Sequence, residues 1–474
     1  MSRAESSASW SELLSGRNAL RSIALAGGVA LHAVNLYIVA TILPSVVGDI
    51  GGLSYYAWNI TLFVAASIFS SSLSPKAMQA LGPRRAFLTA IGFFALGTTL
   101  CMLALAMGWM LIGRTLQGIG GGLLLGLSYS SIRIVFAERL WAKAMALVSS
   151  MWGVAALSGP AIGGVFAYAG HWRWAFGAVL TVALLLAGLV QTQIASRSES
   201  IPINGDARIP LSQISLLVLS VLAVAMASLA AHLGWSVLGV VVALAIGIVV
   251  ARLDARGHAR LMPHGAYELK RLGSIYLCVA FLNIGITVEV FIPYFLQVLH
   301  GHSPLAAGYL GALMSAGWTI GAITSTSRTS RTADVYVRIG PIISALSLAS
   351  LGLMLPWEPL QDALLRWVVV VPLVGVGLGI GMCWPHLLTH VFKVAPAGQE
   401  NMASSAIITI QLYAMALGAA VGGAIINAAG FTDPGGVQGT AQAALALLLI
   451  VALAPGLAAY FVIQVVRGRR SLRG

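Results

Sequence analysis

The chain has 474 residues, of which 58% are hydrophobic and only 9% are charged. That composition excludes an ordinary soluble domain, in which about a quarter of the residues are charged. The formal net charge of +13 would suit a nucleic-acid partner only on a basic, polar face, whereas here the positive charges stand between apolar runs. We therefore predict an all-α polytopic membrane protein that is surrounded by the lipid bilayer and binds no nucleic acid.

Apolar runs of about 20 residues, long enough to cross a hydrocarbon core of about 30 Å, recur along the whole chain. We place fourteen transmembrane spans, at 22–47, 55–75, 85–107, 109–131, 141–168, 173–194, 211–232, 234–252, 274–298, 305–325, 335–355, 366–390, 402–427 and 440–466. Lys and Arg concentrate at both termini and in alternate loops, and only Arg114, Arg173 and Arg366 fall elsewhere. Because positive loops stay in the cytoplasm, this pattern predicts a multi-pass protein of the cell inner membrane with both termini cytoplasmic.

Three stretches in the first half of the chain hold glycine, proline and arginine residues whose positions a membrane span alone does not explain. The loop after span 2 ends in Gly82, Arg84 and Arg85, span 4 holds Arg114, Gln117, Gly118 and Gly120, and span 5 holds Gly159, Pro160, Gly163 and Gly164 ahead of Trp172-Arg173-Trp174. Small residues let membrane helices approach backbone to backbone. An arginine inside a span costs ~2.5–3.5 kcal/mol on insertion scales, so it usually faces a cavity or a partner. The alternative is that Arg114 snorkels to the nearby outer end of its span.

These stretches resemble motifs A, B and C of drug exporters in the major facilitator superfamily, and the number of spans resembles its fourteen-span drug:proton antiporter family. Motifs B and C are complete, whereas motif A has Pro75 for its leading glycine and Gln79 for its aspartate. The resemblance implies that Arg114 takes part in proton coupling. It also implies that Gly82, Arg84 and Arg85 belong to a cytoplasmic gate, while the alternative for the two arginines is ordinary positive-inside charge.

The same resemblance implies the major facilitator fold, with two six-helix bundles and an inserted two-helix hairpin. Polar segments on either side of spans 7 and 8 indicate where the hairpin is inserted. The predicted organisation is a cytoplasmic N-terminus at 1–21, an N-terminal bundle at 22–194, linkers and hairpin at 195–271, a C-terminal bundle at 272–466 and a cytoplasmic tail at 467–474.

Span 1 contains a stretch, His32 to Pro44, that resembles the first-helix motif of the same family. Asn35 takes the place of the acidic residue in that motif, and an amide can hydrogen-bond a substrate but cannot titrate. His32 lies three residues earlier on the same helical face and could supply the lost protonation. The alternative is a histidine that is bonded to a neighbouring helix.

Glu289 in span 9 is the only acidic residue near the middle of a predicted span. Desolvation at that depth disfavours its charged form, so we predict that it exchanges protons when water reaches it and carries the coupling proton. The alternative is a permanently protonated acid bonded to a neighbouring helix. Five amphipathic residues are predicted to line the central substrate cavity: Asn35, Trp152, Tyr294, Gln297 and Gln411.

The sequence indicates no catalytic residue, cofactor or metal. His386 and His390 are four residues apart, but no third ligand stands nearby, and Cys101, Cys278 and Cys383 all fall within apolar runs. No phosphate-binding loop occurs, so ATP is not the expected energy source. We therefore predict that the protein is not an enzyme.

The main hypothesis is a proton-coupled antiporter that exports amphipathic organic compounds or drugs by alternating access. Its partners would be a small-molecule substrate and protons, and it would function as a monomer. One alternative is a narrow exporter of an endogenous metabolite, such as a siderophore or an antibiotic. Another is an uncoupled facilitator or a membrane receptor, because Asn35 and Gln79 replace acids of the family motifs.

Overall fold

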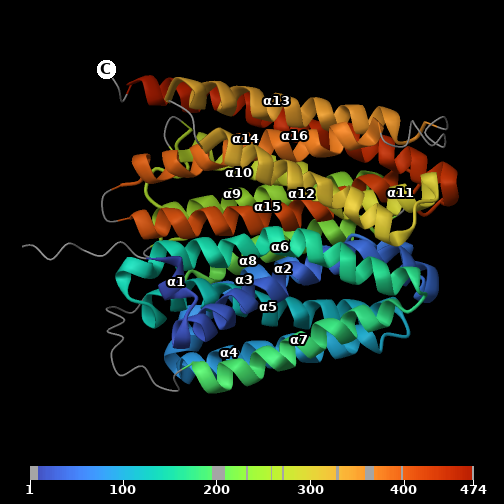
Figure 1. Ribbon diagram of the computed structural model, residues 1–474. Helices are drawn as coiled ribbons and strands as arrows, with labels where there is room; N and C mark the ends of the chain where they lie inside the picture. Colours follow the sequence, from blue (N-terminus) through green and yellow to red (C-terminus); the bar gives the residue numbers. More distant parts are fainter. Residues whose placement is uncertain are drawn as a thin grey trace, which may run out of the picture.

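The computed structural model consists of long helices that run side by side (Figure 1). It describes residues 9–194, 209–230, 233–257, 259–269, 272–326, 330–357, 368–396 and 399–471, and no strand occurs among them. The α-helices are α1 (Trp10–Leu13), α2 (Gly16–Ile50), α3 (Trp58–Ser72), α4 (Ser74–Met102), α5 (Met107–Val135), α6 (Trp141–Tyr168), α7 (Trp172–Gln193), α8 (Leu211–Ala227), α9 (Leu233–Arg256), α10 (Leu272–Ile286), α11 (Ile292–His300), α12 (Pro304–Thr326), α13 (Ser330–Met354), α14 (Val370–Val394), α15 (Glu400–Ala428) and α16 (Gly436–Ser471). Three short 3-10 turns are η1 (Leu53–Tyr55), η2 (Glu138–Leu140) and η3 (Thr287–Val290).

Thirteen helical segments among the described residues are long and apolar enough to cross a membrane, and α8 adds a shorter apolar helix of 17 residues. Each predicted span overlaps one of these helices. The all-α membrane architecture is therefore confirmed, and the predicted number of fourteen spans is consistent with it.

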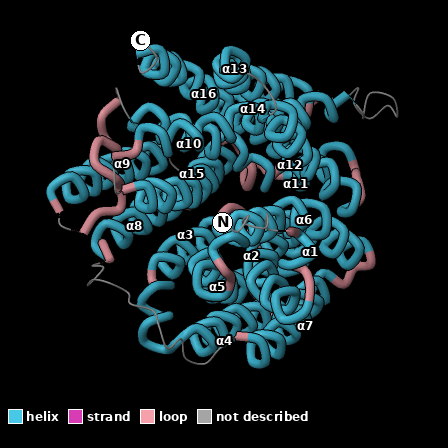
Figure 2. Tube along the Cα trace, turned by 60° about the vertical axis from the view of Figure 1, so that its left-hand side comes forward, coloured by secondary structure: helices cyan, strands magenta, loops and turns pink. Residues whose placement is uncertain are grey.

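Helices α2 to α7 gather in a first half of the molecule, and α10 to α16 gather in a second half (Figures 1 and 2). Helices α8 and α9 pack on each other beside the seam between the halves, where α8 contacts both α3 and α15. The predicted bundle boundaries at 194 and 271 adjoin or lie among residues outside the described ranges. The boundaries themselves therefore stay predictions.

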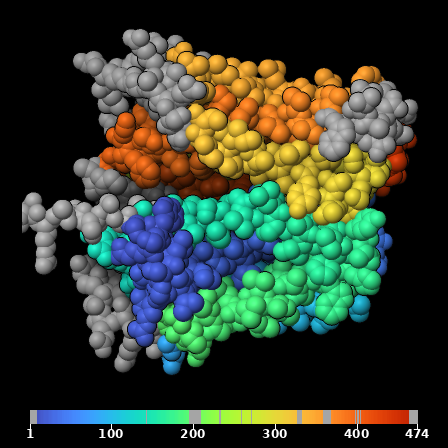
Figure 3. All heavy atoms as spheres, viewed as in Figure 1, coloured from blue at the N-terminus to red at the C-terminus, as the bar shows by residue number. Residues whose placement is uncertain are grey.

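The halves meet where the charge pattern places the outer side of the membrane. Gly164 on α6 lies so close to α12 that a Cβ at this position would be 2.6 Å from the Cα of Leu305. Gly423 on α15 approaches α3 in the same way, because a Cβ there would be 2.5 Å from the Cβ of Ala57. At the right of Figure 3, residues near 300 rest directly on residues near 160. Small residues thus close the seam at its outer end.

Two membrane helices are interrupted. Inside α4, Gly82 has φ 75° and ψ 163°, a conformation that favours glycine, so the motif A stretch forms a short helix that turns before the span begins. Span 9, which the sequence predicted as continuous, is divided into α10, η3 and α11, and Pro293 stands in the first turn of α11. Proline removes a backbone donor and ends the preceding helix. The break places Glu289 in η3.

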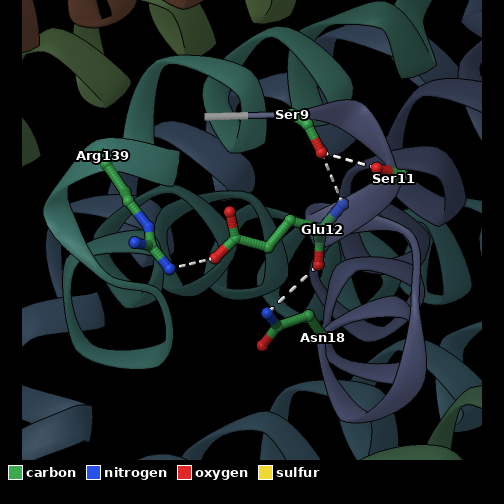
Figure 4. Close-up of polar contacts among 5 residues, drawn as sticks. All are labelled: Ser9, Ser11, Glu12, Asn18 and Arg139. Atoms are coloured by element: carbon green, nitrogen blue, oxygen red, sulfur yellow. Dashed lines mark hydrogen bonds and ion pairs between the residues drawn. The ribbon is translucent and has the colours of Figure 1, made fainter. Parts of the chain in front are cut away.

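The N-terminal helix α1 is attached to the loop between α5 and α6 (Figure 4). The Ser9 hydroxyl accepts a hydrogen bond from the Glu12 N–H at 3.1 Å, and Asn18 Nδ2 donates to the Glu12 carbonyl at 3.3 Å. The Glu12 carboxylate pairs with Arg139 in η2, and Leu13 is fully buried. Exposed ion pairs contribute about 0–1 kcal/mol, so burial of Leu13 is the larger part of this attachment.

The segment after α9 folds around the carboxylate of Asp254. That carboxylate accepts hydrogen bonds from the N–H groups of Leu261 at 2.5 Å and Met262 at 3.2 Å, and from the Tyr267 hydroxyl at 3.0 Å. Burial and the neighbouring carboxylate raise the pKa of Tyr267, so its hydroxyl stays protonated and donates. Residues 261–267 of the connection between the hairpin and α10 are therefore held around one carboxylate.

Candidate functional site

Arg114 on α5 lies entirely inside the first half, with 0% of its surface exposed. Its Nε donates to the Asn59 carbonyl at 2.9 Å, its Nη1 donates to Gln117 Oε1 at 2.7 Å, and its guanidinium carbon is 4.3 Å from the centre of the Phe63 ring. Among the described residues, its Nη2 has no hydrogen-bond partner and no carboxylate pairs with it. The snorkelling alternative is therefore wrong, because the side chain does not reach the outer surface.

Gln117 connects Arg114 to the neighbouring helices. Its Oε1 also accepts from Asn35 Nδ2 at 3.3 Å, and its Nε2 donates to Thr98 Oγ1 at 2.9 Å. We call Arg114, Gln117, Asn35, Asn59 and Thr98 the inner cluster. All five residues are 0% exposed and belong to α2, α3, α4 and α5. The cluster thus compensates a buried positive charge with dipoles of one half alone.

Motif B glycines permit the helix contacts that enclose the inner cluster. A Cβ at Gly118 would be 2.3 Å from the carbonyl oxygen of Phe63, and a Cβ at Gly120 would be 2.3 Å from the backbone nitrogen of Phe94. Real Cβ atoms do not approach backbone so closely. Both positions therefore require glycine for α5 to pack on α3 and α4.

His32 lies on α2, close to Asn35, but faces an aromatic environment. Its ring centre is 5.0 Å from that of Phe63 and 5.8 Å from that of Trp152, and the residue is 0% exposed. Neither ring nitrogen has a hydrogen-bond partner among the described residues. His32 Nδ1 also lies against the backbone of Gly121 on α5, 3.0 Å from where a Cβ would stand. Its predicted role in proton coupling and the alternative of a histidine bonded to a neighbouring helix therefore both stay predictions.

Glu289 in η3 joins a chain of polar groups that crosses the seam. The Ser315 hydroxyl on α12 donates to Glu289 Oε1 at 2.8 Å, and the Tyr37 hydroxyl on α2 lies 2.9 Å from Ser315 Oγ. We call Tyr37, Ser315 and Glu289 the seam chain. No described Lys or Arg pairs with the Glu289 carboxylate, and the residue as a whole is partly buried. A carboxyl group in this position can lose or take up a proton without breaking an ion pair.

The other predicted cavity residues lie in several places. Tyr294 belongs to an aromatic group near the outer side, with its ring centre 5.2 Å from that of Tyr56 and 4.8 Å from that of Phe431. Gln297 and Gln411 are partly buried, and Gln297 Nε2 has no hydrogen-bond partner among the described residues. Asn35 is fully buried in the inner cluster, and Trp152 packs against His32. Whether these residues line one cavity stays a prediction.

The motif A residues have different surroundings. Arg84 Nε donates to the carbonyl of Ile194, the residue that caps the C-terminus of α7, at 2.8 Å. Arg85 and Gln79 are exposed, and Gly82 forms the break in α4. Arg84 therefore compensates a helix C-terminus within the first half. The predicted gate is neither confirmed nor contradicted by these contacts.

The motif C glycines face two different partners. Gly159 and Gly163 pack against α2, where a Cβ would be 2.4 Å from the Tyr37 Cβ and 3.0 Å from the Ile38 carbonyl oxygen, respectively. Gly164 faces Leu305 across the seam, and the Pro160 side chain lies beside Gly308 of α12. Motif C therefore forms part of the contact between the halves and also positions Tyr37.

Sequence reasoning did not identify several residues of these networks. Tyr37, Asn59, Thr98 and Ser315 are ordinary polar residues inside apolar runs, and only their contacts distinguish them. The visible signal for the break beside Glu289 was Pro293, because a helix usually ends just before a proline.

Comparison with known proteins agrees with the resemblance found in the motifs. Residues 25–419 match the family described as Major Facilitator Superfamily. A protein of Mycobacterium tuberculosis named a probable multidrug-efflux transporter is 35% identical over 464 residues, which cover 96% of this chain and 97% of that protein. A multidrug transporter protein of Bacillus subtilis is 26% identical over 373 residues, which cover 77% of this chain and 68% of that protein.

A solved structure shows the same fold at low identity. It is a bacterial homolog of the human lysosomal transporter Spinster in an inward-facing and unoccupied conformation, with a TM-score of 0.63 and 17% identity over 95% of this chain and 97% of that chain. The helical architecture, the complete motifs B and C and the matched relatives lead to one conclusion. This chain belongs to the Major Facilitator Superfamily.

Proposed function

We propose that this transporter is a proton-coupled antiporter that exports amphipathic organic compounds from the cytoplasm by alternating access. The relatives named for multidrug efflux support the substrate class. The distribution of Lys and Arg supports a place in the cytoplasmic membrane with both termini inside. In this proposal the protein works as a monomer, without a metal or a cofactor, and catalyses no chemical reaction.

The position of Glu289 carries the proposal. Its carboxyl group lies in a broken membrane helix, beside the seam, and has one hydrogen bond and no cation as a partner among the described residues. Secondary transporters commonly place their substrate and coupling-ion sites at such discontinuous helices. A proton or a cationic substrate would each neutralise the carboxylate, so the two would compete for it. That competition is sufficient for antiport.

The other predicted residues take supporting roles in this proposal. Arg114 provides a fixed positive charge in the inner cluster, and His32 is a second candidate for proton transfer. The aromatic and amide groups of Asn35, Trp152, Tyr294, Gln297 and Gln411 would contact the organic part of the substrate. Gly82, Arg84 and Arg85 would act on the cytoplasmic side.

The test is transport by purified protein in liposomes with an imposed pH gradient and a fluorescent organic cation. Wild-type protein should accumulate the cation against its gradient and release protons in exchange. Glu289→Gln should retain some binding but lose uphill transport and the pH dependence of substrate affinity. Glu138→Gln is the matched control, because Glu138 is exposed in η2, and it should behave like the wild type.

Two outcomes would contradict the proposal. If Glu289→Gln still concentrates the cation with an unchanged pH profile, coupling runs through another group. If the wild-type protein moves substrate only down its gradient and moves no protons, the chain is an uncoupled facilitator.

A further inference from the structure

The seam chain is held from both halves of the protein. Tyr37 belongs to α2 of the first half, whereas Ser315 on α12 and Glu289 in η3 belong to the second half. A second tyrosine of the first half bonds the residue after Glu289: the Tyr56 hydroxyl donates to the Val290 carbonyl at 3.3 Å. The broken segment that contains Glu289 is therefore bound to the first half through two hydroxyl groups.

The charge of Glu289 determines the direction of these hydrogen bonds. An ionised carboxylate only accepts, so Ser315 must donate its single hydroxyl hydrogen to Glu289. The Ser315 oxygen can then only accept, and the Tyr37 hydroxyl must donate to it. Hydrogen bonds to an ionised group are about twice as strong as neutral ones. Neutralising Glu289 removes both this strength and the fixed order of donors.

The backbone around Tyr37 leaves its side chain little freedom. The Tyr37 carbonyl accepts from Thr41 Oγ1 at 2.9 Å, and Gly159 of motif C lies directly against the Tyr37 Cβ. On the opposite side of the seam, a Cβ at Gly308 would be 2.7 Å from Thr41 Cγ2. Tyr37 therefore lies beside the contacts of α2 with α6 and α12, and its hydrogen bond to Ser315 persists only while the halves stay together.

The titratable groups on the helices around Glu289 bond to other partners, so among the described residues the polar contacts of its carboxylate run to Ser315 and through it to Tyr37. On α2, the Tyr37 hydroxyl lies 2.9 Å from the Ser315 hydroxyl, while His32 packs against Phe63 and Trp152, and α12 presents the neutral Ser315 to Glu289. The titratable side chains of the other neighbouring helices bond elsewhere. On α10, Tyr276 donates to the Ala403 carbonyl and Cys278 to the Ala458 carbonyl. On α15, Tyr413 bonds the Ser220 hydroxyl, and on α16 Tyr460 is exposed. On α11, Tyr294 packs in the aromatic group with Tyr56 and Phe431, and the ring of His300 lies beside the Leu355 carbonyl.

We propose that Tyr37 and Ser315 form an outer latch with Glu289, which holds the outer end of the seam closed while the carboxylate is ionised. A proton or a cationic substrate that neutralises the carboxylate releases the latch and lets the outer end open. This inference rests on the proposed role of Glu289 as the group shared by proton and substrate. It assigns to Tyr37 and Ser315 the task of converting that charge into the position of the two halves.

The latch has a consequence for coupling. An empty, ionised protein that faces the cytoplasm is held closed on its outer side, so it does not return outward without cargo. Removal of the latch should therefore allow substrate-free cycling and a leak of driving force, even though the carboxyl group itself is intact.

The experiment measures the outer distance between the halves by double electron–electron resonance in liposomes. Spin labels on cysteines introduced at Leu105, between α4 and α5, and at Val437, in the first turn of α16, report on the first and second half, because these side chains are 81% and 62% exposed. The native Cys101, Cys278 and Cys383 are all buried. In the wild type without substrate, the long-distance population should be small at alkaline pH and should grow as the pH falls.

Two substitutions remove the latch while the Glu289 side chain itself is kept. Tyr37→Phe should raise the ratio of long to short distances at alkaline pH about threefold to tenfold, since it removes one neutral hydrogen bond. Ser315→Ala should raise that ratio about tenfold or more, since it removes the bond to the charged group as well. Both variants should lose the pH response. Tyr309→Phe and Thr319→Ala on α12 are the controls, because Tyr309 is exposed and Thr319 bonds its own helix.

The results separate the latch from the proposed function. Unchanged distances in both Tyr37→Phe and Ser315→Ala would overturn the latch, and the proton-coupling role would still stand if Glu289→Gln loses uphill transport. If Glu289→Gln transports uphill like the wild type, the proposed function fails, whatever the distances show. If the two latch variants shift the distances but keep a wild-type pH response, the link to the charge of Glu289 is wrong.

Discussion

The inner cluster and the seam chain are both polar networks within the membrane, but they differ in what they connect. The inner cluster joins α2, α3, α4 and α5, all of the first half, and is fully buried. The seam chain joins α2 to η3 and α12, and Glu289 as a whole is only partly buried. A network inside one half can persist while the halves move, whereas a network between them must break whenever the seam opens.

Arg114 and Glu289 therefore place charge in two different settings, one fixed inside a half and one at the contact between the halves. The guanidinium of Arg114 is held by three groups of its own half and has no reason to move during transport. The carboxyl group of Glu289 is bonded to Ser315, which is bonded in turn to Tyr37 of the other half, so the proposed opening would separate Ser315 from Tyr37. We therefore expect changes in the inner cluster to affect stability and activity together, and changes in the seam to affect conformation first.

The largest effect is expected for Arg114→Ala. The substitution should abolish transport while the protein still inserts into the membrane, because the inner cluster loses the fixed positive charge that the proposed function assigns to it. It should also lower the free energy of unfolding by ~1–3 kcal/mol, since the Asn59 carbonyl loses its buried donor. Dye export in cells and thermal unfolding in detergent measure the two effects.

Arg114→Lys sharpens this prediction. Lysine keeps the charge but cannot reproduce the two directed bonds of the guanidinium to Asn59 and Gln117. It should be more active than the alanine variant and less active than the wild type. Export at the wild-type rate by Arg114→Ala would show that the inner cluster is only structural.

The second largest effects are expected for two Gly→Ala substitutions. One adds a methyl group inside the first half, and the other adds it at the seam. Gly120→Ala would push on the Phe94 backbone within the first half and should destabilise the protein by ~1–3 kcal/mol. Gly164→Ala would push on the Leu305 backbone across the seam. It should separate the outer ends of the halves and raise the outward-open population more than it lowers the unfolding temperature.

Outer-end distances and thermal unfolding, measured on both variants, test that contrast. Gly163→Ala is the matched control within motif C, because its new methyl group would meet the Ile38 carbonyl of the first half and not α12. The comparison between half and seam fails if Gly120→Ala opens the outer end as much as Gly164→Ala does.

The smallest effect is expected at the cytoplasmic end. Arg84→Ala should lower the free energy of unfolding by about 0.3–1 kcal/mol, because it removes a cation and a donor from the C-terminus of α7. Arg85→Ala, at an exposed position beside it, should leave stability unchanged. Equal stabilities of the two variants in chemical unfolding would mean that the Arg84 bond adds nothing. A larger loss of transport in Arg85→Ala would favour the gate that motif A predicts.

The fold and the charged members of the site were accessible from the sequence. Apolar runs of spanning length are visible one at a time, and a charge inside such a run is rare enough to single out Arg114 and Glu289. The glycines of motifs B and C were also visible, and the structure gives each of them a close backbone or side-chain contact.

The partners of those charges were not accessible in the same way. Tyr37 and Ser315 are 278 positions apart, and each resembles any polar residue that packs between membrane helices. Their pairing depends on how α2 meets α12, which no local pattern encodes. The sequence likewise could not show that Asn35 turns toward Gln117 and is fully enclosed.

The hairpin α8–α9 gives the seam two unequal edges toward the lipid. Along one edge, α8 covers the junction of α3 with α15, and the Ser220 hydroxyl lies 3.0 Å from that of Tyr413 on α15. Along the other edge, α6 and α12 expose Leu157 and Ile323 to the bilayer at 62% and 67%. A compound dissolved in the membrane would therefore meet α8 at one edge of the seam and exposed apolar side chains of α6 and α12 at the other. The hairpin thus shields the seam where α3 meets α15, and this shield is specific to one lipid-facing edge.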